Sequence, residues 1–206
     1  FPADQIAIYP EYDGLREALI ANLESSPAGL ASALTSAHVG VFNGVDAAIH
    51  AVIHAYGAAG DTLLTTSPTF GYYAPCAGMQ GMAVEAVPHE MPGFAFPMEA
   101  IRAALLRRPR ILMLCNPNNP TGTRLPAGQV LELAAGAPET LVVVDELYEA
   151  FTGDSVLPSV DLRAVPNLLV RRSLAKTAGL AGLRIGFALG HPDVVDRVGR
   201  VTGPYD

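Results

Sequence analysis

The sequence predicts an α/β protein with a mostly parallel, seven-stranded sheet and helices on both faces. Seven apolar segments of strand length recur along the 206 residues, and helical patterns separate most of them. Several segments, such as residues 111–115 and 141–144, are apolar at every position. Strands covered by helices on both faces have this continuous pattern, and alternating strands and helices favour parallel strands joined by right-handed crossovers.

The expected strands are residues 39–42, 62–66, 82–87, 111–115, 141–144, 168–170 and 185–189. Three stretches between them have helical features. Residues 47–56 place apolar side chains at helical spacing, and residues 97–108 and 126–135 each begin with proline, which suits a first helical turn. Residues 62–84 form the longest uncharged stretch, but their Pro and Gly residues predict a strand, a loop and a short helix rather than a membrane span.

Composition narrows the possible functions. Hydrophobic residues make up 50% of the chain and charged residues 16%, which excludes a disordered protein. The net charge of −7 repels phosphate backbones, so no nucleic-acid partner is expected. Cys76 and Cys115 belong to no CxxC pair, and we expect two reduced, buried thiols. The first residues lack a signal-peptide pattern, so the expected location is cytoplasmic.

Lys176 is the only lysine among 13 basic residues. Lysine, unlike arginine, can lose its proton and attack a carbonyl to form a Schiff base. Its neighbours Leu174, Ala175 and Ala178 are apolar, so we expect the amine in apolar surroundings at the edge of the sheet. Taken alone, Lys176 could equally be an ordinary surface lysine.

Polar residues also follow the other strands, at the carboxyl edge where ligands of such sheets bind. Asp145 follows an apolar strand, and a buried carboxylate there needs a partner such as a protonated pyridine nitrogen. Tyr148 could donate a hydrogen bond to a phenolic oxygen on the same ring. The alternative is a helix-capping aspartate with a core tyrosine.

Two further groups of residues fit one ligand. Residues 116–122, Asn-Pro-Asn-Asn-Pro-Thr-Gly, form a rigid loop that can fix the Asn119 amide, although a simple tight turn would have the same composition. Ser173 and Arg184 suit a phosphate, as do the N–H groups of a helix that begins near Gly44. A surface arginine and a turn glycine are the alternatives.

In their order and spacing, these motifs resemble those of the class I/II pyridoxal-phosphate aminotransferases of fold type I, and most closely the histidinol-phosphate aminotransferase branch. The resemblance covers nearly the whole chain. It implies pyridoxal 5'-phosphate as cofactor and a fold that is the large cofactor-binding domain of that family. Transfer of an amino group would run from an amino acid, or an amino-alcohol phosphate such as histidinol phosphate, to a 2-oxo acid.

The resemblance also implies a role for each matching residue. Lys176 would form the Schiff base and carry the substrate proton, Asp145 would pair with the pyridine nitrogen, and Tyr148 would be the third catalytic residue. Tyr148 and Asn119 would hold the phenolic oxygen of the cofactor. The remaining expected cofactor contacts are Phe70 on the ring and Gly44, Val45, Asp46, Ser173 and Arg184 at the phosphate. No residue is expected to bind a metal.

The family pattern further implies a homodimer, in which Tyr9 reaches the phosphate site of the neighbouring subunit. Residues 1–206 would be the large cofactor-binding domain, and we expect the small C-terminal domain and the N-terminal arm to lie outside this chain. Two positions depart from the pattern, because Val45 stands where serine or alanine is common and Ala175 where serine is frequent. Each departure removes a side-chain contact.

Other functions remain open on the same scaffold. A pyridoxal-phosphate-dependent decarboxylase or C–S lyase would share Lys176 and Asp145, and so would a non-catalytic fragment that only binds cofactor or dimerises. His50 and His54 are interpreted as a polar helix face rather than a metal site. No GxGxxG, GxxxxGK[ST] or GxSxG motif indicates a nucleotide-binding protein or a serine hydrolase, and Gly182, Gly186 and Gly190 are expected to serve close packing.

Overall fold

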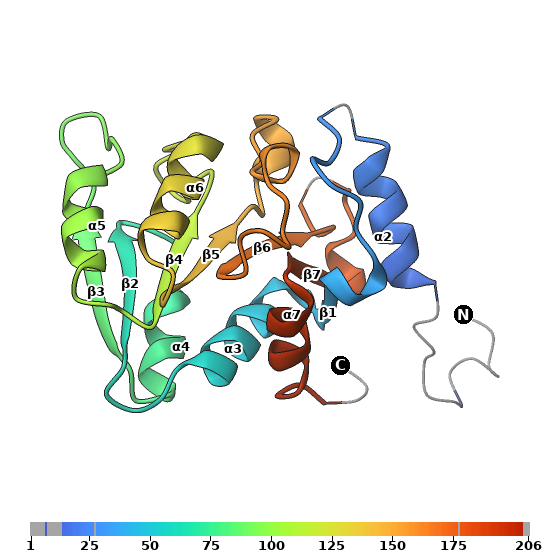
Figure 1. The fold of residues 1–206 in the computed structure, drawn as a ribbon, viewed down its shortest axis with the longest axis horizontal. Helices are drawn as coiled ribbons and strands as arrows, with labels where there is room; N and C mark the ends of the chain where they lie inside the picture. The colour runs from blue at the N-terminus through green and yellow to red at the C-terminus, as the bar shows by residue number, and fades with distance from the viewer. Residues whose placement is uncertain (1–6, 8–13, 27, 177, 204–206) are drawn as a thin grey trace.

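The computed structural model describes residues 7, 14–26, 28–176 and 178–203, and its strands form a single sheet (Figure 1). The strands are β1 (Val39–Asn43), β2 (Thr62–Ser67), β3 (Ala83–Pro88), β4 (Ile111–Cys115), β5 (Leu141–Asp145), β6 (Leu168–Ser173) and β7 (Ile185–Gly190). Their order in the sheet is β1-β7-β6-β5-β4-β2-β3. β7 is antiparallel to both of its neighbours and the other pairs are parallel, so the predicted mostly parallel seven-stranded sheet is confirmed.

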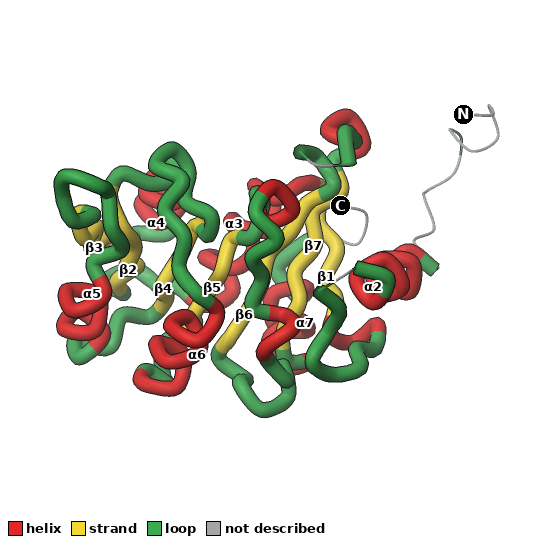
Figure 2. Tube along the Cα trace, turned by 90° about the horizontal axis from the view of Figure 1, so that it is seen from above, coloured by secondary structure: helices red, strands yellow, loops and turns green. Residues whose placement is uncertain are grey.

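The α-helices are α2 (Leu15–Glu24), α3 (Gly44–Tyr56), α4 (Tyr73–Met79), α5 (Met98–Leu105), α6 (Ala127–Gly136) and α7 (Pro192–Gly199). Three of them, α3, α5 and α6, lie where helices were predicted, and α4 is the short helix expected after β2. The sequence analysis did not predict α2 and α7. The helices lie on both sides of the sheet (Figure 2), as predicted.

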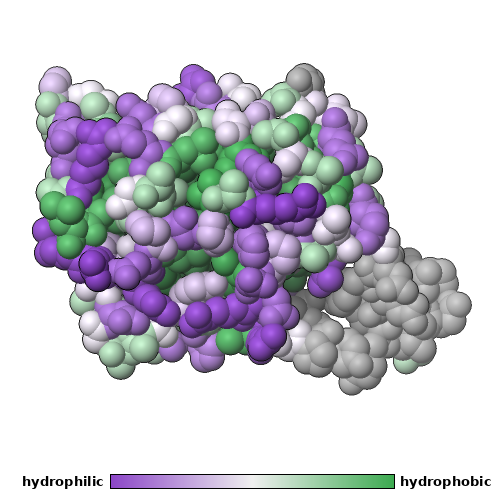
Figure 3. All heavy atoms as spheres, viewed as in Figure 1, coloured by the Kyte–Doolittle hydropathy of each residue, from purple (hydrophilic) through white to green (hydrophobic). Residues whose placement is uncertain are grey.

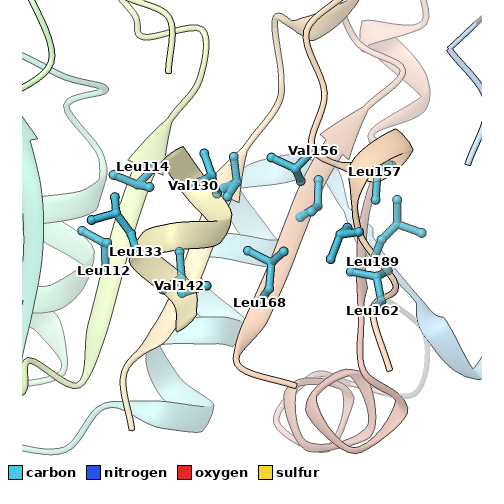
Figure 4. Close-up of a cluster of buried hydrophobic side chains, with 14 of the residues drawn as sticks. Leu112, Leu114, Val130, Leu133, Val142, Val156, Leu157, Leu162, Leu168 and Leu189 are labelled. Carbon is cyan, nitrogen blue, oxygen red and sulfur yellow. The ribbon is translucent and has the colours of Figure 1, made fainter. Parts of the chain in front are cut away.

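Two hydrophobic cores result, because alternate residues of each central strand point to opposite faces. Leu112 and Leu114 pack under α5 and α6, and Figure 4 shows part of this cluster. The intervening Ile111 and Met113 pack under α3 and α4. A strand that is apolar at every position therefore has both faces buried, which explains why β4 and β5 read as continuous hydrophobic runs.

The surface is mixed, with hydrophilic and hydrophobic residues interspersed over the face seen in Figure 3. Among the described helices, none is long and apolar enough to span a bilayer. Cys76 and Cys115 are free and buried, as expected. His50 and His54 are exposed and stack on one side of α3, which agrees with a polar helix face.

Candidate functional site

The sheet register brings the predicted site residues to one edge. In adjacent parallel strands Cys115 lies opposite Asp145, and Asp145 lies opposite Arg171. The antiparallel β7 starts at this same edge, so that its first residue, Ile185, lies opposite Asn43 at the end of β1. The loops that follow β1, β4, β5 and β6 and precede β7 therefore converge, as the rule for α/β sheets predicts.

Asp145 is the most constrained group at this edge. Its side chain is 2% exposed, and its Oδ2 accepts a hydrogen bond of 2.6 Å from the Tyr73 hydroxyl. The guanidinium of Arg171, itself completely buried, lies 3.4 Å from the same oxygen. The second oxygen, Oδ1, is buried and has no hydrogen-bond partner among the described residues. Because a buried carboxylate oxygen without a donor is costly, this atom marks a place where a donor is missing.

Tyr73 and Cys115, which lie beside Asp145, keep their protons at neutral pH. Burial, and then the nearby Asp145 carboxylate, raise the pKa of Tyr73 well above its ordinary value. The same two causes raise the pKa of the Cys115 thiol to about 12. Tyr73 is therefore a permanent donor to Asp145 at neutral pH, and the Cys115 thiol is no competing anion.

The side chains of Asn119 and Tyr148 contact each other at this edge of the sheet. The Asn119 Nδ2 donates a hydrogen bond of 3.2 Å to the Tyr148 hydroxyl oxygen, and the backbone N–H of Asn119 contacts Cys115 Sγ at 3.4 Å. Burial, followed by the nearby Cys115 and Asp145, raises the pKa of Tyr148. The Tyr148 hydroxyl therefore keeps its proton at neutral pH. It can donate a hydrogen bond to a ligand oxygen while it accepts the hydrogen bond from Asn119.

The loop at residues 116–122 is held by Asn118, whose buried side chain makes four contacts. Its Nδ2 lies 2.9 Å from the Pro68 carbonyl oxygen, 2.7 Å from Thr121 Oγ1 and 3.3 Å from His89 Nε2. Its Oδ1 accepts a hydrogen bond of 2.7 Å from Thr69 Oγ1. The amide of Asn119 is thus fixed by the side chain next to it.

His89 makes this loop sensitive to pH. Its Nδ1 lies 3.3 Å from the Ala95 carbonyl oxygen, so Nδ1 carries the proton and Nε2 accepts from Asn118. Burial lowers the pKa of His89, although the Ala95 contact opposes the shift. Because the unfolded chain binds this proton at an ordinary pKa near 6.5, we expect the free energy of unfolding to decrease as pH falls below that value.

The measurement is urea unfolding at several pH values from neutral to acidic. His38, whose pKa burial also lowers, contributes to the same loss in the wild-type protein. A His89→Gln variant should therefore show a shallower decrease, while the exposed-residue control His50→Gln should match the wild type. Equal pH dependence of all three proteins would contradict the role of His89.

The residues predicted to bind a phosphate, at the start of α3 and at Ser173 and Arg184, lie at the same edge of the sheet. A Cβ atom at Gly44 would lie 2.5 Å from the Arg184 Nη2, so only glycine lets the guanidinium rest on the first turn of the helix. Arg184 Nη2 is 3.9 Å from Asp46 Oδ2, and Arg184 adopts a left-handed φ of 53°. The Ser173 hydroxyl is held at the end of β6 by the Ala175 N–H and the Ile185 carbonyl. Free N–H groups at the start of a helix, with the guanidinium beside them, favour an anion.

Gly186 allows α3 to approach the sheet at this point. A Cβ atom there would overlap the backbone of Gly44 and Val45, so we expect Gly186→Ala to lower the free energy of unfolding by about 1–3 kcal/mol, the usual cost of overpacking. Urea unfolding tests this, with Gly182→Ala as control because nothing lies within 4 Å of a Cβ there. Equal destabilisation by both variants would contradict the close-packing role.

The expected packing role is confirmed for Gly186 and Gly190, and is wrong for Gly182.

Lys176 lies three residues after the end of β6 and is exposed. The expectation of apolar surroundings is wrong, because the loop between Leu174 and Leu183 is exposed or only partly buried throughout its described residues. Within the described part of the chain, no hydrogen bond or ion pair holds the amine. Its position after β6 nevertheless places it at the edge that carries Asp145 and Ser173.

Phe70 and Tyr9 complete the predicted set. Phe70 is partly buried and packs edge-on against Tyr73, with ring centroids 5.5 Å apart. It therefore neighbours the tyrosine that binds Asp145. Tyr9 lies outside the described residues.

An ion pair between Arg172 and Glu146, which was not predicted from the sequence, holds the loop that carries Tyr148. Arg172 donates from Nε and Nη2 to Glu146 Oε2 at 3.0 and 2.9 Å. The same carboxylate accepts from the Ser155 hydroxyl and the Val156 N–H. Burial raises the pKa of Glu146, and Arg172 opposes that shift. Since every acceptor is satisfied, this network fixes the loop after β5 that carries Tyr148.

A cleft lies elsewhere among the described residues. It has a volume of about 650 Å³ and runs between β1 and α7, where Phe42 and Val195 line it. None of the predicted site residues lines this cleft. This cleft and the motifs that follow the strands are therefore separate features, and the edge of the sheet that carries Asp145 is the candidate site.

The chain matches the family described as aminotransferase class I and II over residues 3–205. The histidinol-phosphate aminotransferase of Gluconacetobacter diazotrophicus is 38% identical over 186 residues, which cover 86% of this chain and 49% of that protein. The chain thus spans about half the length of this curated relative.

Solved structures show the same fold. A putative histidinol-phosphate aminotransferase from Erwinia carotovora atroseptica superposes with a TM-score of 0.85 at 28% identity, covering 98% of this chain and 57% of the other. The histidinol-phosphate aminotransferase from Sinorhizobium meliloti, solved in complex with pyridoxal-5'-phosphate, has a TM-score of 0.84 at 26% identity and covers 98% and 53% of the two chains.

Proposed function

The chain belongs to the class I and II aminotransferase family, and from this premise we propose that it binds pyridoxal 5'-phosphate at the carboxyl edge of the sheet and transfers amino groups. The observation that carries the proposal is Asp145 Oδ1, which is buried and to which no residue in the described part of the chain donates a hydrogen bond. A protonated ring nitrogen supplies the missing donor with a matching charge. The residues around Asp145 therefore fit the cofactor of the family.

The other residues fit the rest of the cofactor. The hydroxyl of Tyr148, which accepts from Asn119, is free to donate to the phenolic oxygen. Phe70 provides an aromatic surface beside Asp145 and its donor Tyr73. The phosphate is assigned to Ser173, Arg184 and the first turn of α3, formed by Gly44, Val45 and Asp46.

When bound, pyridoxal phosphate supplies an aldehyde that condenses with amines and a ring that accepts electrons from the attached carbon. Lys176 would hold the cofactor through its amine Nζ, and the same amine would act as the base that takes the proton from the substrate α-carbon. Asp145 holds the proton on the ring nitrogen. The exposed Lys176 side chain is free to move between these tasks because no described residue binds it.

The proposal extends to substrates, assembly and location. Amino donors are an amino acid or an amino-alcohol phosphate of the histidinol phosphate kind, and the acceptor is a 2-oxo acid. Residues 1–206 are assigned to the cofactor-binding domain of a cytoplasmic homodimer, with Tyr9 directed to the phosphate site of the neighbouring subunit. The length match to about half of a curated relative supports this domain assignment.

A half-reaction tests the proposal. The purified protein is incubated with pyridoxal phosphate, freed of excess cofactor, and mixed with histidinol phosphate or single amino acids without an acceptor. We expect one donor to convert the bound aldehyde to the amine form, visible as loss of the cofactor's visible absorbance, and a 2-oxo acid to restore it. Release of carbon dioxide or of a thiol would instead support a decarboxylase or a C–S lyase, and a protein whose bound cofactor no donor changes would contradict amino transfer.

A further inference from the structure

Arg171 is a charged residue in the interior of the protein, and it follows the apolar residues 168–170 of strand β6. Its side chain is completely buried. Nη2 donates a hydrogen bond of 2.9 Å to the Val45 carbonyl oxygen in the first turn of α3, and Nη1 lies 3.4 Å from Asp145 Oδ2 and 4.0 Å from Met113 Sδ. Nε has no partner. A buried guanidinium is tolerated only when a carboxylate balances its charge, and Asp145 is the carboxylate within reach.

The two described partners of Asp145 lie at one of its oxygens. Tyr73 and Arg171 approach Oδ2, whereas no described residue pairs with Oδ1. This arrangement fixes the rotation of the Asp145 carboxylate, because turning it would move Oδ2 away from Tyr73 and Arg171. The oxygen left over is the one assigned above to the ring nitrogen.

We propose that Arg171 is a positioning residue that orients Asp145 and weakens its hold on the proton of the cofactor's ring nitrogen. This inference rests on the proposed function. A fixed positive charge next to Asp145 draws part of the carboxylate's charge to Oδ2, so Oδ1 becomes a weaker acceptor. The bound ring nitrogen then loses its proton at a lower pH than it would beside an Asp145 without this neighbour.

Arg171 also connects two parts of the site through its hydrogen bond to the Val45 carbonyl oxygen. Val45 belongs to the first turn of α3, which is assigned to the phosphate, while Asp145 is assigned to the ring. One side chain therefore links the two ends of the cofactor site and sets the spacing between them.

The other titratable groups that face Asp145 are Tyr73 of α4, Cys115 of β4 and Tyr148 after β5, all of which burial keeps protonated at neutral pH.

The decisive experiment follows the ring nitrogen itself. Protein reconstituted with pyridoxal phosphate carrying an isotope label at that nitrogen is titrated by NMR, in the wild type and in Arg171→Met. We expect the proton to be lost about one pH unit higher in Arg171→Met, and Arg171→Lys to return the titration toward the wild-type value. Arg110→Met is the control, because Arg110 also donates to a backbone carbonyl, that of Tyr56, at 2.8 Å, and lies away from Asp145.

A titration of Arg171→Met that coincides with the wild type would overturn the inference while leaving the proposed function intact. Failure of the wild-type protein to bind pyridoxal phosphate would overturn the proposed function. The two failures are therefore distinguishable.

A second measurement needs no cofactor. Urea unfolding compares the wild-type protein, Arg171→Met, Asp145→Asn and the double variant after removal of any bound cofactor. We expect each single change to raise the unfolding equilibrium constant about 100-fold or more, because it leaves a buried charge unpaired. The double variant should be more stable than the product of the two effects predicts, and it should fold even if Arg171→Met does not. Additive effects, or a double variant that fails to fold, would overturn the pairing.

Discussion

Replacing Lys176 by alanine is expected to abolish covalent attachment of pyridoxal phosphate and to lower the rate of amino transfer by at least about 10²–10⁴-fold, the usual contribution of a positioned acid–base group. Lys176 is the only lysine of the chain, so no other side chain can replace its amine. Because its side chain is exposed, the free energy of unfolding should change by less than about 0.5 kcal/mol. The loss of chemistry is thus separated from any loss of fold.

The matched control is Lys176→Arg, which keeps the positive charge but cannot lose its proton to become a nucleophile. It should be as inactive as the alanine variant and equally stable. Rates, cofactor absorbance and urea unfolding are measured on all three proteins. Amino transfer by either variant at the wild-type rate would contradict the role of Lys176.

Replacing Asp145 by alanine is expected to have the largest effect on stability. The change leaves Arg171 as an unpaired buried charge and removes the acceptor of the Tyr73 hydroxyl. Breaking a buried pair in this way costs about 3–5 kcal/mol. The variant also loses the partner of the ring nitrogen, so any folded protein should bind pyridoxal phosphate much more weakly.

Tyr73→Phe is the comparison for the Asp145→Ala variant. It removes one neutral donor and leaves the Asp145–Arg171 pair in place, so its cost should be about 1–3 kcal/mol. Thermal and urea unfolding give both values. If Asp145→Ala is no more destabilising than Tyr73→Phe, the ion pair contributes nothing and this description of the interior is wrong.

Much of the fold could be predicted because β4 and residues 141–144 of β5 are apolar at every position, which is the pattern of strands buried on both faces. The helices α2 and α7 were missed although their signals exist. In α7, proline opens the first turn and Val194, Val195 and Val198 share one buried face. The helix spans only residues 192–199, so few apolar positions mark its spacing.

Within the candidate site, local motifs predicted the residues that follow each strand, and the register brings Asp145, Asn119, Tyr148 and Ser173 to one edge. Tyr73 and Arg171 could not be found in this way, because their contacts with Asp145 depend on how α4 and β6 pack against β5. The one local signal was a charged residue, Arg171, directly after the apolar residues 168–170 of β6. The exposure of Lys176 was also beyond local reasoning, since apolar neighbours in sequence do not become neighbours in space when the loop lies on the surface.

The central claim is that the amine of Lys176 binds the aldehyde of pyridoxal phosphate, and reductive trapping tests it most directly. The protein with bound cofactor is treated with borohydride, digested and mapped by mass spectrometry. We predict a single stable adduct on the peptide that contains Lys176, absent from the Lys176→Ala variant. An adduct confined to the N-terminal amine, or one that persists unchanged in Lys176→Ala, would contradict the claim.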